Sequence, residues 1–162
     1  MEIRDTYTRK DGKEFSFIYH ENDPHKGVET HQLRAVHGFC FTLEGQMILV
    51  NHPTSGWIPP GGGVEKDEHI NDAVIREVLE ETNMKVLHKE YLGSVDYPDD
   101  GQRHVRFFCL VKPLGPFVSD PDGDIEEIKE VDPFLDDIKN HFDWGPAGDR
   151  LMKLSRDMFS EF

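Results

Sequence analysis

Three glutamates, Glu77, Glu80 and Glu81, stand at positions i, i+3 and i+4 of a stretch whose apolar residues recur at helical spacing. On a helix this spacing puts three carboxylates on one face, with Cβ atoms roughly 5–6 Å apart. Glu77 and Glu81 would repel each other, and the dipole disfavours anions near the helix end. A hard divalent cation would offset that cost, because it takes oxygen ligands. The cluster therefore predicts a metal site. The alternative, without a function, is a solvated acidic helix face.

The residues around this cluster support the metal site. A glycine run at 61–63 precedes the helix, and glycine lets backbone approach a ligand closely. Arg76 lies inside the cluster and follows Glu68 by about two helical turns. The two side chains can therefore pair and orient the carboxylates, so we include both in the catalytic set. We expect the helix to begin near Glu68 and to end near Thr82.

The spacing of these residues resembles the Nudix hydrolase box, G-x5-E-x7-R-E-U-x-E-E-x-G-U, in which U is aliphatic. The positions that match are Gly62, Glu68, Arg76, Glu77, Val78, Glu80, Glu81 and Met84. Asn83 stands where the box has its second glycine. Since that glycine falls where the helix stops, we expect a left-handed residue there, a conformation that Asn tolerates.

The resemblance implies a Mg²⁺-dependent hydrolase, with Mn²⁺ as a substitute ion. It would cleave the diphosphate bond of a nucleoside diphosphate linked to another moiety, as in a nucleoside triphosphate or ADP-ribose. Glu77, Glu80 and Glu81 would hold the metal, with the Gly61 carbonyl as a further ligand. Glu127, at the start of a late strand, best fits an additional metal carboxylate of the family. Either Glu77 or Glu80 would take the proton from water, and the sequence leaves the two open.

Three residues, Trp57, Tyr97 and Arg106, are the main candidates for contact with the substrate. Trp57 and Tyr97 offer rings on which a base could stack, and Phe39 is a further candidate. Arg106 belongs to a small basic cluster in an otherwise acidic chain. The alternative is that the rings are packing residues and that the arginine pairs with surface acids.

The remaining sequence supplies the elements that must position these groups. A hairpin over residues 1–20 and a polar loop to residue 32 form an N-terminal extension. Strands are expected at 33–42, 46–51, 86–87, 91–95, 104–112 and 127–131, and further helices at 133–142 and 147–159. Asp120, Asp122 and Asp124 in the loop 113–125 indicate a solvated acidic turn. Together with the resemblance, this order predicts an α/β fold, a Nudix-type α/β/α sandwich with a central mixed sheet, as one domain over 1–162.

The charge and the hydropathy of the chain limit the kinds of partner that it can bind. The chain has 162 residues, 18 Lys and Arg, 32 Asp and Glu, and a net charge of −14. Such a surface repels nucleic acid and anionic membrane, so we expect a small nucleotide partner rather than DNA, RNA or membrane. A homodimer is compatible with the sequence. No apolar run reaches the roughly 18 residues of a membrane span, and the polar N-terminus does not resemble a signal peptide, so we expect a cytoplasmic protein.

Three other functions compete with the hydrolase. An RNA 5′-pyrophosphohydrolase needs a basic track, which the charge of −14 disfavours. A non-catalytic nucleotide-sensing Nudix domain would be expected to lose box carboxylates, and none is lost. The isomerase branch of the same fold would need a nucleophilic cysteine, for which Cys40 is the candidate. Cys40 and Cys109 are otherwise expected to be buried free thiols.

Overall fold

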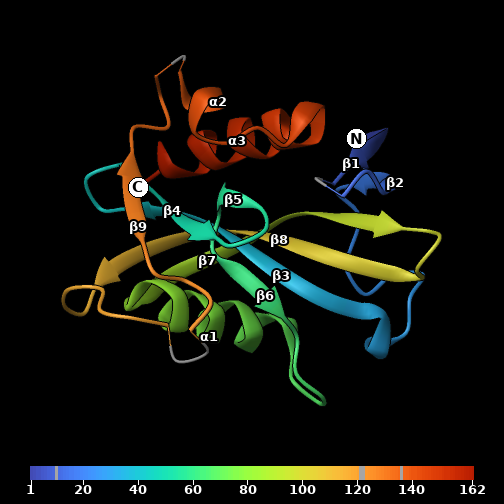
Figure 1. Cartoon of the computed structure of the whole chain (residues 1–162), viewed down its shortest axis with the longest axis horizontal. Helices are drawn as coiled ribbons and strands as arrows, with labels where there is room; N and C mark the ends of the chain where they lie inside the picture. The colour runs from blue at the N-terminus through green and yellow to red at the C-terminus, as the bar shows by residue number, and fades with distance from the viewer. Residues whose placement is uncertain (10, 121–122, 136) are drawn as a thin grey trace.

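A mixed β-sheet with helices on both faces forms the core of the protein (Figure 1). The computed structural model describes residues 1–9, 11–120, 123–135 and 137–162. Its strands are β1 (Glu2–Thr8), β2 (Glu14–His20), β3 (Leu33–Thr42), β4 (Met47–His52), β5 (Gly56–Ile58), β6 (Gly61–Gly63), β7 (Met84–Tyr97), β8 (Gln102–Pro113) and β9 (Ile128–Val131). Its helices are α1 (Ile70–Thr82), α2 (Ile138–His141), α3 (Gly145–Phe159) and a 3₁₀ turn at Thr30–Gln32.

The strand order β1-β2-β7-β8-β3-β4-β5 confirms the predicted mixed sheet. β3 and β8 are parallel, the other pairs are antiparallel, and β6 and β9 add to β3 and β4 respectively. Successive side chains of a strand point to opposite faces. Val36 and Cys40 of β3 therefore face α1, whereas Phe39 and Phe41 join the core beneath α3.

Helix α1 covers the first face of the sheet. Its buried apolar residues recur at the predicted three- and four-residue steps: Ile70, Ala73, Val74 and Val78. The helix begins at Ile70 rather than near Glu68, because the side chain of His69 caps it by accepting from the Asn71 amide. Asn83 ends it with φ 55° and ψ 38°, the left-handed conformation expected there.

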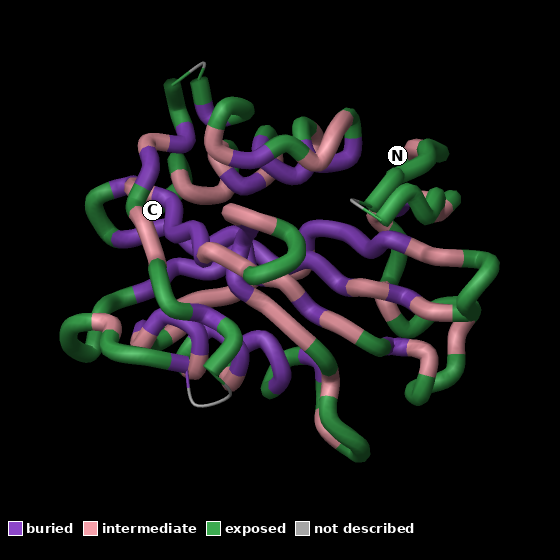
Figure 2. Tube along the Cα trace, in the orientation of Figure 1, coloured by how far each residue is buried: buried purple, intermediate pink, exposed green. Residues whose placement is uncertain are grey.

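Helix α3 covers the other face of the sheet, and buried segments run along it (Figure 2). Its Ala147, Leu151 and Met152 join the buried aromatic residues. The prediction of a helix over 133–142 was wrong in extent, since α2 spans only Ile138–His141. The Asp132 side chain accepts from the Phe134 amide and holds a turn where the helix was expected. No helix in the described ranges is both long and apolar enough to cross a membrane.

The N-terminal hairpin extends the sheet, because β2 pairs with β7 from Ile18↔Asp96 to His20↔Ser94. Its buried Tyr19 hydroxyl donates to Glu21 at 2.7 Å, and Arg150 of α3 donates to the same carboxylate at 2.9 and 3.0 Å. Tyr19 packs so closely on Gly93 that an added Cβ there would lie 2.6 Å from its ring. The hairpin is thus attached to both β7 and α3.

Two strand predictions differ from the structure. The separate strands expected at 86–87 and 91–95 are one strand, β7, because β8 pairs with it from Met84↔Pro113 to Tyr97↔Gln102. Register shifts at Val86/His88 and Tyr91/Gly93 break the alternation that the sequence pattern relies on. The glycine run expected as a loop is strand β6, which pairs with β3 through Ala35, Val36 and His37.

Candidate active site

Arg76 lies at the centre of the α1 carboxylates. Its Nε and Nη2 donate to the two oxygens of Glu68 at 2.8 and 2.9 Å, so the pairing expected from the sequence is present. Its Nη1 donates to Glu77 at 2.9 Å and to Glu80 at 3.2 Å. Its Nη2 also donates to the Gly63 carbonyl at 2.9 Å. One guanidinium therefore joins three box carboxylates to the end of β6.

Glu81 faces away from Arg76 and accepts a 2.8 Å hydrogen bond from the Gly61 amide. Glu77 and Glu81 are 9% and 6% exposed. Burial raises the pKa of Glu77, and it raises the pKa of Glu81 to about 8 against the opposing hydrogen bond from Gly61. The negative charges of Glu77 and Asp120 add to the rise in the pKa of Glu81. These two carboxyls therefore lie where a bound cation would greatly favour their ionised form.

Asp120 is a member of this group that the sequence did not single out. The interpretation of residues 120–124 as a solvated turn was wrong for Asp120, which is 6% exposed, while Asp122 lies outside the described residues. The negative charge of Asp120 raises the pKa of both Glu77 and Glu81. Ile125, 1% exposed, packs with β4 and β5 and holds the loop against the protein. Ile125 is the one large apolar residue of the acidic stretch 119–127, and this is the signal that could have indicated a packed loop.

Glu127, the carboxylate favoured from the sequence, contacts Asn51 of β4. It is exposed, and its Oε1 accepts from the Asn51 side chain at 3.3 Å. Its backbone carbonyl accepts from the Asn51 amide at 3.0 Å, next to the pairing of β9 with β4. The loop carboxylates whose charges raise the pKa values of the box carboxyls are Asp120, which acts on Glu77 and Glu81, and Asp124, which acts on Glu81.

The donors fit a hard divalent cation in chemistry. No three His, Cys, Asp or Glu side chains of the described residues are arranged as a ready metal site, and Arg76 holds Glu77 and Glu80. Their oxygens are nonetheless the ligands that Mg²⁺ takes, and the buried pair is short of positive charge. Backbone approaches this group closely, since a Cβ at Gly62 would lie 2.7 Å from the Glu77 carboxylate.

We expect Gly62→Ala to lower activity roughly 100-fold, because the new methyl would displace the Glu77 carboxylate and catalytic groups tolerate little misplacement. The melting temperature should change little, since the displaced atoms are the end of a flexible side chain. Gly63→Ala is the matched control, because its nearest contact would be the Arg34 carbonyl at 3.8 Å. Steady-state rates and thermal melts of both variants check this. Equal activity of the two would contradict it.

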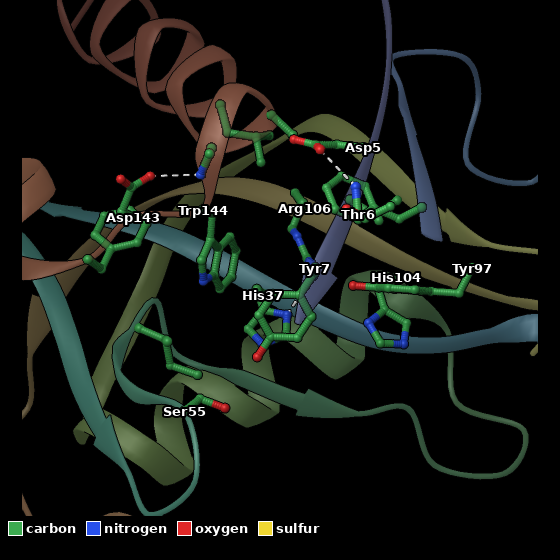
Figure 3. A pocket seen from close by; sticks show the side chains of 18 of the residues that line it. Asp5, Thr6, Tyr7, His37, Ser55, Tyr97, His104, Arg106, Asp143 and Trp144 are labelled. Atoms are coloured by element: carbon green, nitrogen blue, oxygen red, sulfur yellow. Dashed lines mark hydrogen bonds between the residues drawn. The ribbon is translucent and has the colours of Figure 1, made fainter. Parts of the chain in front are cut away.

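A cavity of about 490 Å³ lies on the α3 side of the sheet (Figure 3). The three residues expected to contact substrate, Trp57, Tyr97 and Arg106, all line it. Its volume is in the range of small-molecule sites, roughly 300–1,000 Å³. His37 also lines the cavity, and its register partner across β3 and β6 is Gly61, which donates to Glu81. The paired strands β3 and β6 therefore connect the cavity to the carboxylates.

Arg106 is buried at the bottom of this cavity, 5% exposed. Its Nη1 donates to His37 Nδ1 at 2.6 Å, and its guanidinium carbon lies 4.7 Å from the centre of the Trp144 ring. Burial lowers the pKa of Arg106. Burial, and next the charge of Arg106, lower the pKa of His37 well below its usual value and that of His104 to about 3. Both histidines are therefore neutral at pH 7.

Two further sequence candidates lie in the core. Phe39 is 0% exposed and packs against Phe142 and Trp144, so no base can stack on it. Cys40 and Cys109 are buried free thiols, as expected. Burial raises the pKa of Cys40 well above its usual value, which keeps the thiol protonated and unreactive. The structure thus gives the isomerase interpretation no nucleophile.

Known proteins resemble this chain in sequence and in structure. The NUDIX domain family profile matches residues 31–146. The uncharacterized Nudix hydrolase YvcI of Bacillus subtilis is 32% identical over 62 residues, which are 38% of this chain and 39% of that protein. The chain therefore aligns with well under half of the length of that relative.

Two solved structures share the fold. The Bacillus subtilis pyrophosphohydrolase BsRppH superposes with a TM-score of 0.73 over 95% of this chain and 97% of its own, at 16% identity. A C. elegans Ap4A hydrolase superposes with a TM-score of 0.59 over 80% of this chain and 100% of its own, at 22% identity. At these identities the likeness concerns the fold, and it confirms the predicted α/β sandwich.

Proposed function

This chain belongs to the NUDIX domain family, and on that basis we propose that it is a divalent-metal-dependent pyrophosphohydrolase of a small nucleotide. The observation that carries the proposal is the burial of both Glu77 and Glu81, with the pKa of both carboxyls raised. A cluster of carboxylates in a site that disfavours their charge destabilises the fold, and it is suited to bind a cation.

We assign Mg²⁺ to Glu77, Glu80 and Glu81, with Mn²⁺ as a substitute, and the Gly61 carbonyl as a further ligand. We propose Asp120, whose charge acts on Glu77 and Glu81, rather than Glu127 as the additional carboxylate. When bound, the cation would screen the diphosphate oxygens and make water a stronger acid. The chain's own residues would orient the reacting groups and move the proton.

Glu80 is our assignment for the base that takes the proton of the attacking water. Its side chain is 25% exposed, whereas that of Glu77 is 11% exposed, so water reaches Glu80 more readily. Arg76, itself held by both oxygens of Glu68, contacts Glu77 and Glu80 and would fix their orientation. Glu68 and Arg76 are therefore positioning residues in this proposal.

The cavity beneath α3 would hold the nucleoside. Trp57 and Tyr97 present aromatic rings there, and Lys129 lies 4.3 Å from the centre of the Trp57 ring on β5. In this proposal one nucleotide spans both sites where β3 pairs with β6, since His37 lines the cavity and its register partner Gly61 donates to Glu81. The net charge of −14 favours a small nucleotide that arrives with its own cation over an RNA chain.

Product chromatography would test the proposal with ADP-ribose, a dinucleoside polyphosphate, and normal and oxidised nucleoside triphosphates, each with Mg²⁺ or Mn²⁺. We expect cleavage within a diphosphate linkage of at least one of them. Glu80→Gln should lower kcat by about 10²–10⁴-fold, the usual contribution of a positioned base. Glu90→Gln is the control, because the half-buried side chain of Glu90 contacts His88 of the same strand, β7.

Two results would change the proposal. Equal rates in Glu80→Gln and the parent protein would remove Glu80 from the proton transfer. No turnover of any nucleotide, despite Mg²⁺ binding measured by calorimetry, would favour an RNA 5′ end as substrate or a nucleotide sensor.

A further inference from the structure

We infer that Arg106 determines base specificity, and that the cavity prefers a purine with acceptors at O6 and N7, as in guanine or hypoxanthine, over adenine. This inference rests on the proposed function, since it assigns the nucleoside to the cavity. It concerns a different residue and a different face of the sheet from the carboxylate site.

Arg106 lacks the partners that a buried arginine usually has. A guanidinium carries five N–H donors. The described residues give Arg106 the His37 ring nitrogen and a hydrogen bond with Tyr97, and its buried Nε has no partner. No carboxylate among them lies within ion-pair distance of it, whereas the equally buried Arg103 pairs with Asp96 at 2.6 Å. An unpaired buried charge costs several kcal/mol.

A ligand that accepts hydrogen bonds would offset this cost. Arg106 points between Trp144 and Tyr97 in Figure 3, in a cavity with aromatic walls. It is the one Lys or Arg among the described residues that line the cavity. Aromatic walls favour a flat ring, and a flat ring with two adjacent acceptors matches the guanidinium fork, as guanine O6 and N7 do.

The carboxylates of the cavity favour a base over an anion. Asp5 and Asp143 both line it, and their Oδ1 atoms accept from the amides of Thr6 and Gly145 at 2.8 and 2.7 Å. No residue in the described ranges donates to the second oxygen of either carboxylate. These negative groups repel a free anion but accept from N–H donors, which guanine carries on the edge opposite N7.

Adenine fits the same environment poorly. It presents N7 and an N6 amino group where guanine presents N7 and O6. The amino group would face the N–H groups of Arg106, donor to donor. The lowered pKa of His37 keeps its ring neutral, and this does not relieve the conflict. With adenine the site would leave polar groups unpaired, which lowers the affinity for that base.

The test measures nucleotide binding to the parent protein in EDTA, by calorimetry or by quenching of tryptophan fluorescence. The series is GMP, IMP, 7-deaza-GMP and AMP. We expect GMP and IMP to bind about 10–100-fold more tightly than AMP, the discrimination of one bidentate arginine contact. The affinity of 7-deaza-GMP, which lacks N7, should lie between them. Equal binding of GMP and AMP would overturn the inference without any variant.

Variants then locate the effect. Arg106→Met should reduce the affinity for GMP to that for AMP and leave the protein folded, because no described carboxylate loses a partner. Arg34→Met is the matched control, since Arg34 is an exposed residue of β3 outside the cavity lining. Guanine selectivity that survives in Arg106→Met would overturn the role of Arg106.

Failure of this inference differs from failure of the proposed function. Guanine-selective binding with no cleavage of any nucleotide would contradict the hydrolase alone. Cleavage of adenine and guanine nucleotides with equal kcat/KM, lost in Glu80→Gln, would contradict base selection alone.

Discussion

Glu81→Gln is expected to make the metal-free protein more stable than the parent at pH 8. The folded protein raises the pKa of Glu81 from 4.5 to about 8, chiefly through burial, so its ionisation opposes folding. At 1.36 kcal/mol per pKa unit the shift corresponds to roughly 3–5 kcal/mol at pH 8. Glutamine has no charge to bury, and its Oε1 can still accept from the Gly61 amide.

The pH dependence of this effect has a definite sign. Because the pKa of Glu81 is higher in the folded protein than in the unfolded chain, the folded state binds more protons between pH 4.5 and about 8. The stability of the parent should therefore fall as pH rises through this window. Thermal melts in EDTA at pH 5 and pH 8 should show a steeper loss for the parent than for Glu81→Gln. Glu77, whose pKa is also raised, should leave part of the slope in both proteins.

Added Mg²⁺ should reduce the stability advantage of Glu81→Gln over the parent. A ligand of the folded state stabilises it by about 2.7 kcal/mol at a hundred times its Kd. Glu81→Gln should gain less than the parent at the same Mg²⁺ concentration, because one oxygen ligand has lost its charge. Glu90→Gln should behave as the parent does. An equal Mg²⁺-induced shift in parent and Glu81→Gln would argue against Glu81 as a ligand.

The box helix and its carboxylates could be predicted because their geometry is local. Helical periodicity places Glu77, Glu80 and Glu81 on one face, and a separation of about two turns brings Glu68 to Arg76. The left-handed Asn83 likewise follows from its position at the helix end. Each of these predictions depends only on residues within a few turns of one another.

Asp120 and the state of Arg106 could not be predicted, because both depend on contacts far along the chain. The charge of Asp120 acts on the pKa of Glu77 and Glu81 from a loop whose Ile125 packs with Val50 of β4 and Ile58 of β5. Arg106 lies over the sheet beneath Trp144, a residue that precedes α3. The local sequence pattern places Arg106 on one face of a strand. It does not show that no described carboxylate lies close enough to pair with it.

Arg76→Ala is expected to be the most damaging single substitution in α1. It removes the guanidinium that Glu68, Glu77 and Glu80 share. Removing one partner of a buried ion pair costs about 3–5 kcal/mol, and the 22% exposure of the Arg76 side chain places the expectation near 3. For a chain of this length, the melting temperature in EDTA should fall by about 6–12 °C.

Mg²⁺ distinguishes a metal site from an ion-pair network that only stabilises the fold. Arg150→Ala is the matched control, because Arg150 also holds a carboxylate, Glu21, with a side chain 27% exposed, but away from α1. If the α1 carboxylates are metal ligands, Mg²⁺ should raise the melting temperature of Arg76→Ala more than that of Arg150→Ala, since the cation replaces the lost positive charge. Activity should stay low in Arg76→Ala even at saturating Mg²⁺, because Glu80 has lost the group that orients it. Equal Mg²⁺ shifts in the two variants would mean that Arg76 neutralises a structural cluster and that the metal binds elsewhere.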